Sequence, residues 1–202
     1  MKRPAKIGLA VILVFWLVII VLLIFAANRP AHVESGDRRC DHPDDGYSYL
    51  LKSGWETRAC EEKRLLLSNE TYDAAVVFLL ETGGYEYKSG AAVAKMLVKA
   101  MSEEYGDAVR FDENSPAVAD SIYEGIRFGG SINGDEALFY VFHPDVGLRL
   151  YVVCVFGDGV TASVKKEAEA MAVSAEFDDV GAVYAKYMSE TKETKETKET
   201  EE

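Results

Sequence analysis

The chain has 202 residues, of which 49% are hydrophobic, and its 34 acidic and 22 basic side chains give a formal net charge of −12 at pH 7. An acidic surface of this kind repels phosphate backbones, which argues against nucleic acid as a partner. The length suffices for one compact domain beside an N-terminal segment, and not for two domains.

Residues 7–27 (IGLAVILVFWLVIIVLLIFAA) contain no charged residue and no proline. As a helix with a rise of about 1.5 Å per residue they would span roughly 31 Å, the thickness of a bilayer hydrocarbon core. The sequence therefore predicts a transmembrane helix preceded by a basic flank at residues 1–6. The run is too long for a cleaved signal peptide and lacks a small-residue cleavage site, so we interpret it as an uncleaved signal anchor. Because it carries no polar group at membrane depth, we expect an anchor or assembly helix, not a pore.

Residues 28–39 (NRPAHVESGDRR) predict a polar linker, followed by a single domain at residues 40–190. Basic residues flank the apolar run on both sides, so the positive-inside rule does not decide the orientation. Cys40 and Cys60 bracket a short polar segment, and a disulfide between them would need an oxidising compartment. On that basis we expect a cytoplasmic N-terminus and an extracytoplasmic domain. The alternative is two unpaired thiols on a cytoplasmic domain.

The first half of the domain predicts alternating helices and strands. Residues 57–67 predict a helix. Residues 73–81 form a short apolar run that predicts a strand buried on both faces, although the pattern also fits a helix. Residues 89–105 predict a helix with an apolar stripe, ended by Gly106.

Further along, residues 108–112 predict a short strand, and Ser115-Pro116 opens a predicted helix that Gly129-Gly130 closes. Residues 136–156 predict a hairpin turned at 144–147. If His143 pairs with Leu148, both faces of the hairpin are largely apolar, so we expect it inside a sheet with helices or loops covering it.

The remaining segments complete the predicted fold class. Helical signals continue to about residue 172, and a second amphipathic helix follows with Val183 and Tyr187 on its buried stripe. Residues 191–202 (TKETKETKETEE) predict a disordered acidic tail. The order of elements indicates an α+β domain with a mixed sheet, centred on the hairpin at 136–156 and covered by helices.

The segment GGYEYKSG, residues 83–90, lies between a predicted strand and a predicted helix, as a phosphate-binding loop does. Tyr87 stands before Lys88 where such a loop needs glycine, which argues against nucleotide hydrolysis. Ligands of open α/β sheets bind beyond the carboxyl ends of strands. The alternative is an ordinary surface connection. The candidate binding rim consists of Tyr85, Tyr87, Ser89, Asp112 and Glu113.

No group of residues has the spacing of a catalytic or metal centre. Cys40, His42 and Cys60 would supply three zinc ligands without an evident fourth, so we predict no metal, no cofactor and no catalytic residues. We expect a single-pass membrane protein whose acidic domain is a binding or interaction module for a protein partner, such as an accessory subunit of a membrane or envelope complex. The alternative is a membrane-tethered hydrolase whose site is assembled only by folding. The sequence does not indicate which small molecule, if any, the domain binds.

Overall fold

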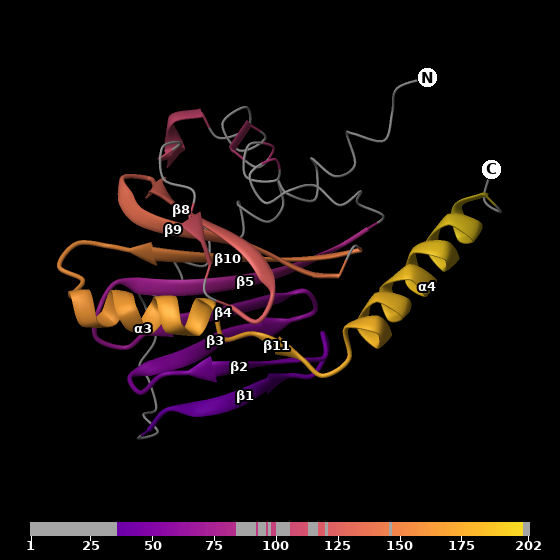
Figure 1. The fold of residues 1–202 in the computed structure, drawn as a ribbon, viewed down its shortest axis with the longest axis horizontal. Helices are drawn as coiled ribbons and strands as arrows, with labels where there is room; N and C mark the ends of the chain where they lie inside the picture. Colours follow the sequence, from indigo (N-terminus) through magenta and orange to yellow (C-terminus); the bar gives the residue numbers. More distant parts are fainter. Residues whose placement is uncertain are drawn as a thin grey trace.

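The described part of the chain forms two antiparallel sheets and two α-helices with defined bounds (Figure 1). The predicted transmembrane segment and most of the predicted linker lie outside the described residues. Within those residues, no helix is both long enough and apolar enough to cross a bilayer. The computed structural model describes residues 36–83, 106–112, 117–119, 121–145 and 147–199, together with Ala92, Met96, Val98 and Lys99.

Three short strands form the small sheet. They are β1 (Arg38–His42), β2 (Tyr47–Leu51) and β11 (Glu176–Phe177), in the order β1-β2-β11. β1 and β2 form a hairpin in which Cys40 is paired with Tyr49. The predicted linker at 28–39 therefore overlaps the first strand of the domain.

The large sheet has eight strands, all paired antiparallel, in the order β3-β4-β5-β10-β9-β8-β6, with β7 also paired to β8. A 3-10 turn at Gly106–Ala108 precedes β6. The strands are β3 (Trp55–Glu61), β4 (Arg64–Asn69), β5 (Ala74–Thr82), β6 (Val109–Phe111), β7 (Ala117–Val118), β8 (Glu124–Ile132), β9 (Asp135–Asp145) and β10 (Leu148–Phe156).

One face of the large sheet packs against the small sheet and helix α3 (Ala162–Ala172), which lies across β5 and β10 (Figure 1). The helix begins at Thr161, whose hydroxyl accepts a hydrogen bond from the Val164 N–H, as an N-cap does. It buries Val164, Ala168 and Met171 against the sheet. This core between the two sheets is called the inner core below.

The opposite face of the large sheet carries a second apolar core. It includes stacked rings of Phe128 and Phe139, whose centroids are 5.4 Å apart, and Phe111 at 4.8 Å from Phe139. Val98 packs on this face, and the described residues of the predicted helix at 89–105 are helical. Because both faces are covered, the central strands are apolar on both sides, as β10 shows with every residue buried.

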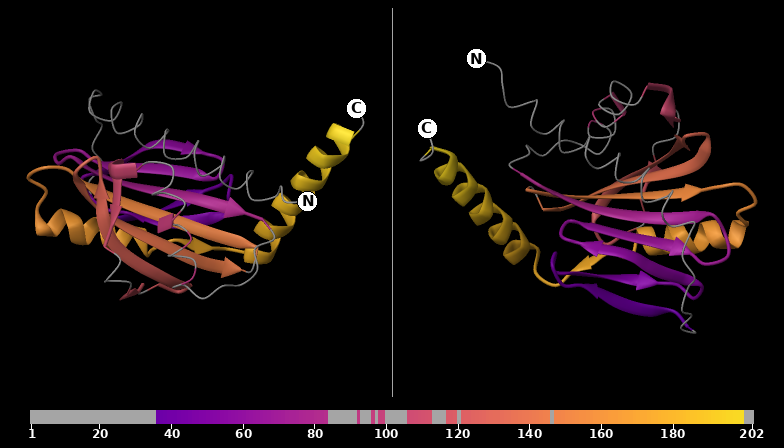
Figure 2. Two further views of the ribbon diagram at one scale, coloured as in Figure 1. Left: turned by 90° about the horizontal axis from the view of Figure 1, so that it is seen from above. Right: turned by 180° about the vertical axis from the view of Figure 1, so that it is seen from behind.

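Helix α4 (Val180–Glu199) packs by its first turns against one end of the sheets and then extends away from them (Figures 1 and 2). Tyr187 is buried and its hydroxyl donates a hydrogen bond to the carboxylate of Asp45. His42 lies 3.6 Å from the same carboxylate. Burial raises the pKa of Asp45, and the hydrogen bond from Tyr187 and the neighbouring His42 oppose that rise. This polar contact joins α4 to the β1–β2 turn.

The fold-class prediction, an α+β domain with a mixed sheet covered by helices, is wrong. The domain is mostly β-sheet, both sheets are antiparallel, and two short helices pack on them. The predicted helix at 57–67 is the β3–β4 hairpin, whose turn residue Lys63 has a φ of 62°. The predicted helix that Ser115-Pro116 opens is replaced by β7 and β8. Cross-strand packing outweighs the helical spacing of apolar residues in both segments.

Other elements agree with the sequence pattern. The predicted strand at 73–81 is β5, buried along most of its length. The predicted hairpin at 136–156 is β9 and β10, although Val141 is opposite Tyr151 and not Leu150. A register irregularity next to the turn, between Leu148 and Leu150, moves the pairing by one residue. In the structure α4 extends to Glu199. The disorder expected for the tail at residues 191–202 stays a prediction.

Candidate functional site

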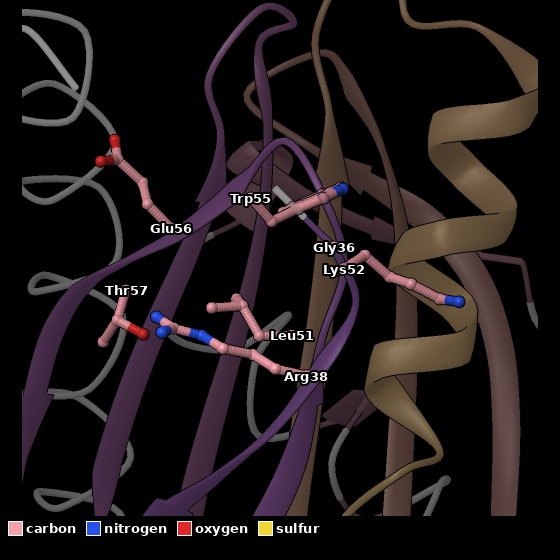
Figure 3. Close-up of a pocket in the computed structure, with 7 residues that line it drawn as sticks. All are labelled: Gly36, Arg38, Leu51, Lys52, Trp55, Glu56 and Thr57. Atoms are coloured by element: carbon pink, nitrogen blue, oxygen red, sulfur yellow. The ribbon is translucent and has the colours of Figure 1, made fainter. Parts of the chain in front are cut away.

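A pocket of about 270 Å³ opens between the small sheet and β3, the edge strand of the large sheet (Figure 3). The small sheet supplies one wall through β1 and β2, and β3 supplies the other. We call this the inter-sheet pocket. Its lining residues are Gly36, Arg38, Leu51, Lys52, Trp55, Glu56 and Thr57.

The pocket exists because β2 and β3 belong to different sheets but are joined by a three-residue turn, 52–54. Trp55 donates its N–H to the Lys52 carbonyl oxygen at 3.1 Å, which closes this turn. Asp37 accepts hydrogen bonds from the Lys52 ammonium at 2.6 Å and from the Ser53 N–H at 3.0 Å. Both hydrogen bonds lower the pKa of Asp37. The start of β1 is thereby held against the start of β3.

The side chains in the pocket combine a cation, a hydroxyl and an apolar surface. The Arg38 guanidinium points toward the Thr57 hydroxyl, Leu51 lies beside the Arg38 side chain, and Glu56 points away (Figure 3). Glu56 forms an ion pair with Arg58. Trp55 is 4% exposed, and its indole N–H donates a hydrogen bond of 3.1 Å to Glu167 of α3.

These contacts determine what the pocket can bind. Thr57 is held by a hydrogen bond of 3.0 Å to the Tyr49 hydroxyl, so its position is defined by the inner core. A planar guanidinium matches a carboxylate in two parallel hydrogen bonds. The arrangement therefore suits an acidic group with an apolar neighbour that can lie on Leu51 and Trp55.

Comparison with solved structures finds a similar fold for the domain. The domain is similar to cyanobacterial PsbP (CyanoP) from Synechocystis sp. PCC 6803, with a TM-score of 0.53 and 12% identity over 74% of this chain and 98% of that chain. The domain has a PsbP-like fold. The match to a structure from Bacteroides thetaiotaomicron VPI-5482 has a TM-score of 0.42 and 13% identity. It covers 73% of this chain and 50% of the Bacteroides chain. No protein-family model and no curated protein sequence matches the chain.

The structure locates one residue of the predicted binding rim. Asp112 is exposed directly after β6, and its N–H donates to the Gly129 carbonyl oxygen at 2.8 Å. β5, which precedes Tyr85, Tyr87 and Ser89 in the chain, is separated from β6 by β10, β9 and β8. At about 4.8 Å per strand, the two strands are roughly 19 Å apart. Tyr85, Tyr87, Ser89 and Glu113 lie outside the described residues.

The predicted disulfide between Cys40 and Cys60 is not formed in the structure, and Cys154 is also a free thiol. Cys154 is fully buried and its thiol lies 3.7 Å from the Ala168 carbonyl oxygen, in agreement with a structural role. Within the described ranges, no cluster of histidine, cysteine and carboxylate side chains could hold a metal ion.

The PsbP-like domain also contains a histidine–carboxylate contact, between His42 and Asp45. Both residues are buried, and the His42 ring donates to the Arg64 carbonyl oxygen at 3.2 Å. Neither lines the inter-sheet pocket. The contact therefore holds the β1–β2 turn in place and gives no support to the alternative of a hydrolase.

A row of ionisable side chains crosses the large sheet on its second face. Glu81 is paired with Arg149, and Glu124 with His143, on neighbouring strands. The Tyr151 hydroxyl donates a hydrogen bond of 2.7 Å to Glu81. Burial and the nearby Arg149 lower the pKa of His143. Opposite charges across strands, such as Glu81 and Arg149, stabilise a sheet, so we assign this row a structural role.

Sequence reasoning missed every residue of the inter-sheet pocket. Arg38 falls in the predicted linker, and Thr57 in a predicted helix. The only local signal is the Lys52-Ser53-Gly54 turn, where Gly54 has a φ of 79° that favours glycine. That signal marks a turn between strands and does not indicate that the strands belong to two sheets.

Proposed function

We propose that the chain is a membrane-anchored binding protein whose PsbP-like domain takes a carboxylate group of a partner protein into the inter-sheet pocket. The observation that carries the proposal is the Arg38 guanidinium, which points across the pocket toward a hydroxyl held by the inner core (Figure 3). The apolar run at residues 7–27 supports the anchor. We place the domain on the extracytoplasmic side because a Cys40–Cys60 disulfide would need an oxidising compartment.

Charge explains why such a pocket would be selective. The chain has a net charge of −12, so its surface repels strongly acidic molecules at a distance. The pocket differs locally, because Arg38 lines it while the single acidic lining residue, Glu56, points away. The other cationic lining residue, Lys52, is paired with Asp37. We therefore expect one isolated carboxylate to be favoured over a run of acidic residues.

The pocket can be tested with glutarate, a small dicarboxylate, and with glutaramide, which has the same shape without charge. The chain contains two tryptophans, so a Trp16→Phe background leaves Trp55 in the pocket wall as the reporter. We expect glutarate to change the Trp55 emission with a Kd of about 1 mM, as suits so small a ligand. Because hydrogen bonds to charged groups stabilise by about 1.5–3 kcal/mol, Arg38→Ala should weaken binding roughly 10- to 100-fold.

The matched control is Arg110→Ala, which removes an exposed arginine from β6, at the opposite edge of the large sheet. It should bind glutarate as the parent does. The titrations use full-length protein in a nonionic detergent. Equal binding of glutarate and glutaramide, or undiminished binding by Arg38→Ala, would show that the pocket does not recognise a carboxylate.

The anchor makes a separate prediction. After washing membranes with alkaline carbonate, the full-length chain should stay in the pellet, because transfer of about 20 apolar residues into lipid is strongly favourable. A variant lacking residues 2–27 should appear in the supernatant. Protease added outside intact cells should digest the domain. Release of the full-length chain by carbonate, or protection of the domain in intact cells, would contradict the anchor or its orientation.

A further inference from the structure

Cys40 faces the gap between the two sheets. It is paired with Tyr49 on the neighbouring strand, and directly opposite residues of an antiparallel pair point to the same face of a sheet. Tyr49 points toward the large sheet, since its hydroxyl is 3.0 Å from Thr57 of β3. Cys40 therefore points toward the large sheet as well, and it packs against the inner core.

Cys60 faces the same gap from the other side. The pairing of β3 with β4 has a register irregularity between Thr57 and Ala59. At this irregularity the alternation of β3 side chains between the two faces of the sheet is shifted. Ala59 packs on the second core, on the far face of the sheet. Cys60 is paired with Leu65, which belongs to the inner core. The Cys60 thiol thus points toward the small sheet and is exposed at the open edge.

The two thiols lie between the same two landmarks along this gap. At one end, Arg38 of β1 points toward Thr57 of β3 (Figure 3). At the other end, His42 of β1 donates a hydrogen bond of 3.2 Å to the Arg64 carbonyl oxygen, at the start of β4. Cys40 lies midway between the two contacts on β1, and Cys60 lies between them on the β3–β4 hairpin.

The Tyr49 hydroxyl lies between the strands that carry the two thiols: Tyr49 is paired with Cys40, and its hydroxyl is 3.0 Å from Thr57, three residues before Cys60. Burial raises the pKa of Tyr49, and both Cys40 and Cys60 lie close enough to its hydroxyl to add to that rise. A disulfide requires Cβ atoms that face each other across a short gap, and Cys40 and Cys60 face the same gap from opposite sheets.

We propose that Cys40 and Cys60 form a reversible disulfide that joins the two sheets beside the inter-sheet pocket and holds Arg38 and Thr57 at a constant separation. The effect on binding rests on the proposed function, whereas the bond itself does not. The pocket would then be fully organised only after the protein has reached an oxidising compartment. A reducing environment would loosen the wall that carries Arg38.

The oxidant is a disulfide, such as oxidised glutathione or an exported dithiol oxidoreductase. The exposed Cys60 thiolate attacks one sulfur of that disulfide and releases the first thiol. The Cys40 thiolate then attacks Cys60 in the mixed disulfide and releases the second thiol. Two S–H bonds of the protein are replaced by one S–S bond, and the oxidant receives two electrons and two protons. Burial, Asp44 and Asp45 raise the pKa of Cys60, so exchange should accelerate as the pH rises above neutrality.

The bond is tested on the full-length chain in nonionic detergent after incubation with oxidised glutathione. The chain has three cysteines, so denaturation and alkylation with N-ethylmaleimide should modify one thiol in the oxidised protein and three after reduction. Peptide mapping should find Cys40 joined to Cys60. Closing a loop of this size should raise the Tm by about 6–12 °C. Cys40→Ser and Cys60→Ser should each abolish both changes. Three alkylated thiols, or stable glutathione adducts on both cysteines, would overturn the proposal.

The coupling is tested by titrating glutarate into the oxidised and the reduced protein. Preorganisation of the pocket should lower the Kd in the oxidised state by roughly threefold or more. Equal affinity in the two states would overturn the coupling. Failure of glutarate to bind in either state would overturn the carboxylate pocket, and the disulfide would still be judged by its mass and peptide map.

Discussion

Replacing Gly130 with alanine should destabilise the protein by about 3 kcal/mol, the upper part of the range for steric overpacking. A Cβ at this position would lie 2.1 Å from the Arg110 carbonyl oxygen and 3.1 Å from the ring of Phe139. The first contact is with backbone, so no side chain can rotate away. β6 would have to separate from β8, and the paired rings of Phe111 and Phe139 would separate with it.

The neighbouring glycine provides a matched control. A Cβ at Gly129 would meet nothing within 4 Å, so Gly129→Ala should change the free energy of unfolding by less than about 0.5 kcal/mol. Urea unfolding of both full-length variants in nonionic detergent measures the difference. Similar midpoints for the two variants would show that β6 does not lie against β8 at this distance. Glutarate binding should be unchanged, because β6 and the pocket are at opposite edges of the sheet.

Strands with continuous apolar sequence could be predicted because they are buried on both faces. β5 and β10 have this character, and the segments at 73–81 and 148–156 were identifiable from it. Helix α3 could also be predicted, since its cap residue and apolar spacing agree with each other. In these segments local propensity and tertiary packing favour the same conformation.

Segments where local and tertiary preferences differ could not be assigned correctly. Arg64 to Asn69 has three consecutive leucines that fit a helical stripe equally well, but β5 offers a long apolar strand beside it. Ile126, Phe128 and Ile132 also fit helical spacing in part, yet they bury one face of β8, while Ile122 is 68% exposed. The deciding partner is distant in sequence in both cases, so a single-sequence pattern does not contain it.

The position of the pocket could not be predicted for the same reason. Arg38 and Thr57 are neighbours only because β1 belongs to the small sheet and β3 to the large one. The predicted rim relied on a rule for parallel α/β sheets, and both sheets here are antiparallel. Cys40 and Cys60 likewise lie on strands of different sheets, which their spacing in the sequence does not indicate.

Tyr187 should be the most sensitive residue of α4, because the rest of the helix extends away from the sheets (Figure 2). Its ring is buried beneath the Lys63 ammonium, which lies 4.1 Å from the ring centroid. Tyr187→Ala should destabilise the protein by about 3–5 kcal/mol, as is usual for a buried aromatic side chain. Tyr72 is 36% exposed, so Tyr72→Ala should cost less than about 1 kcal/mol. Equal urea midpoints for these variants would show that α4 does not dock through Tyr187.

Tyr187→Phe separates the hydroxyl from the ring. It removes the hydrogen bond that lowers the pKa of Asp45, so that pKa should rise further above its unfolded value. The folded state then binds the Asp45 proton more tightly than the unfolded state, and ionising Asp45 costs stability as the pH rises through the folded pKa. We therefore expect a deficit of about 1–3 kcal/mol against wild type at neutral pH. Urea titrations at decreasing pH should show this deficit shrinking as Asp45 becomes protonated, whereas a deficit independent of pH would mean that the hydroxyl does not act through Asp45.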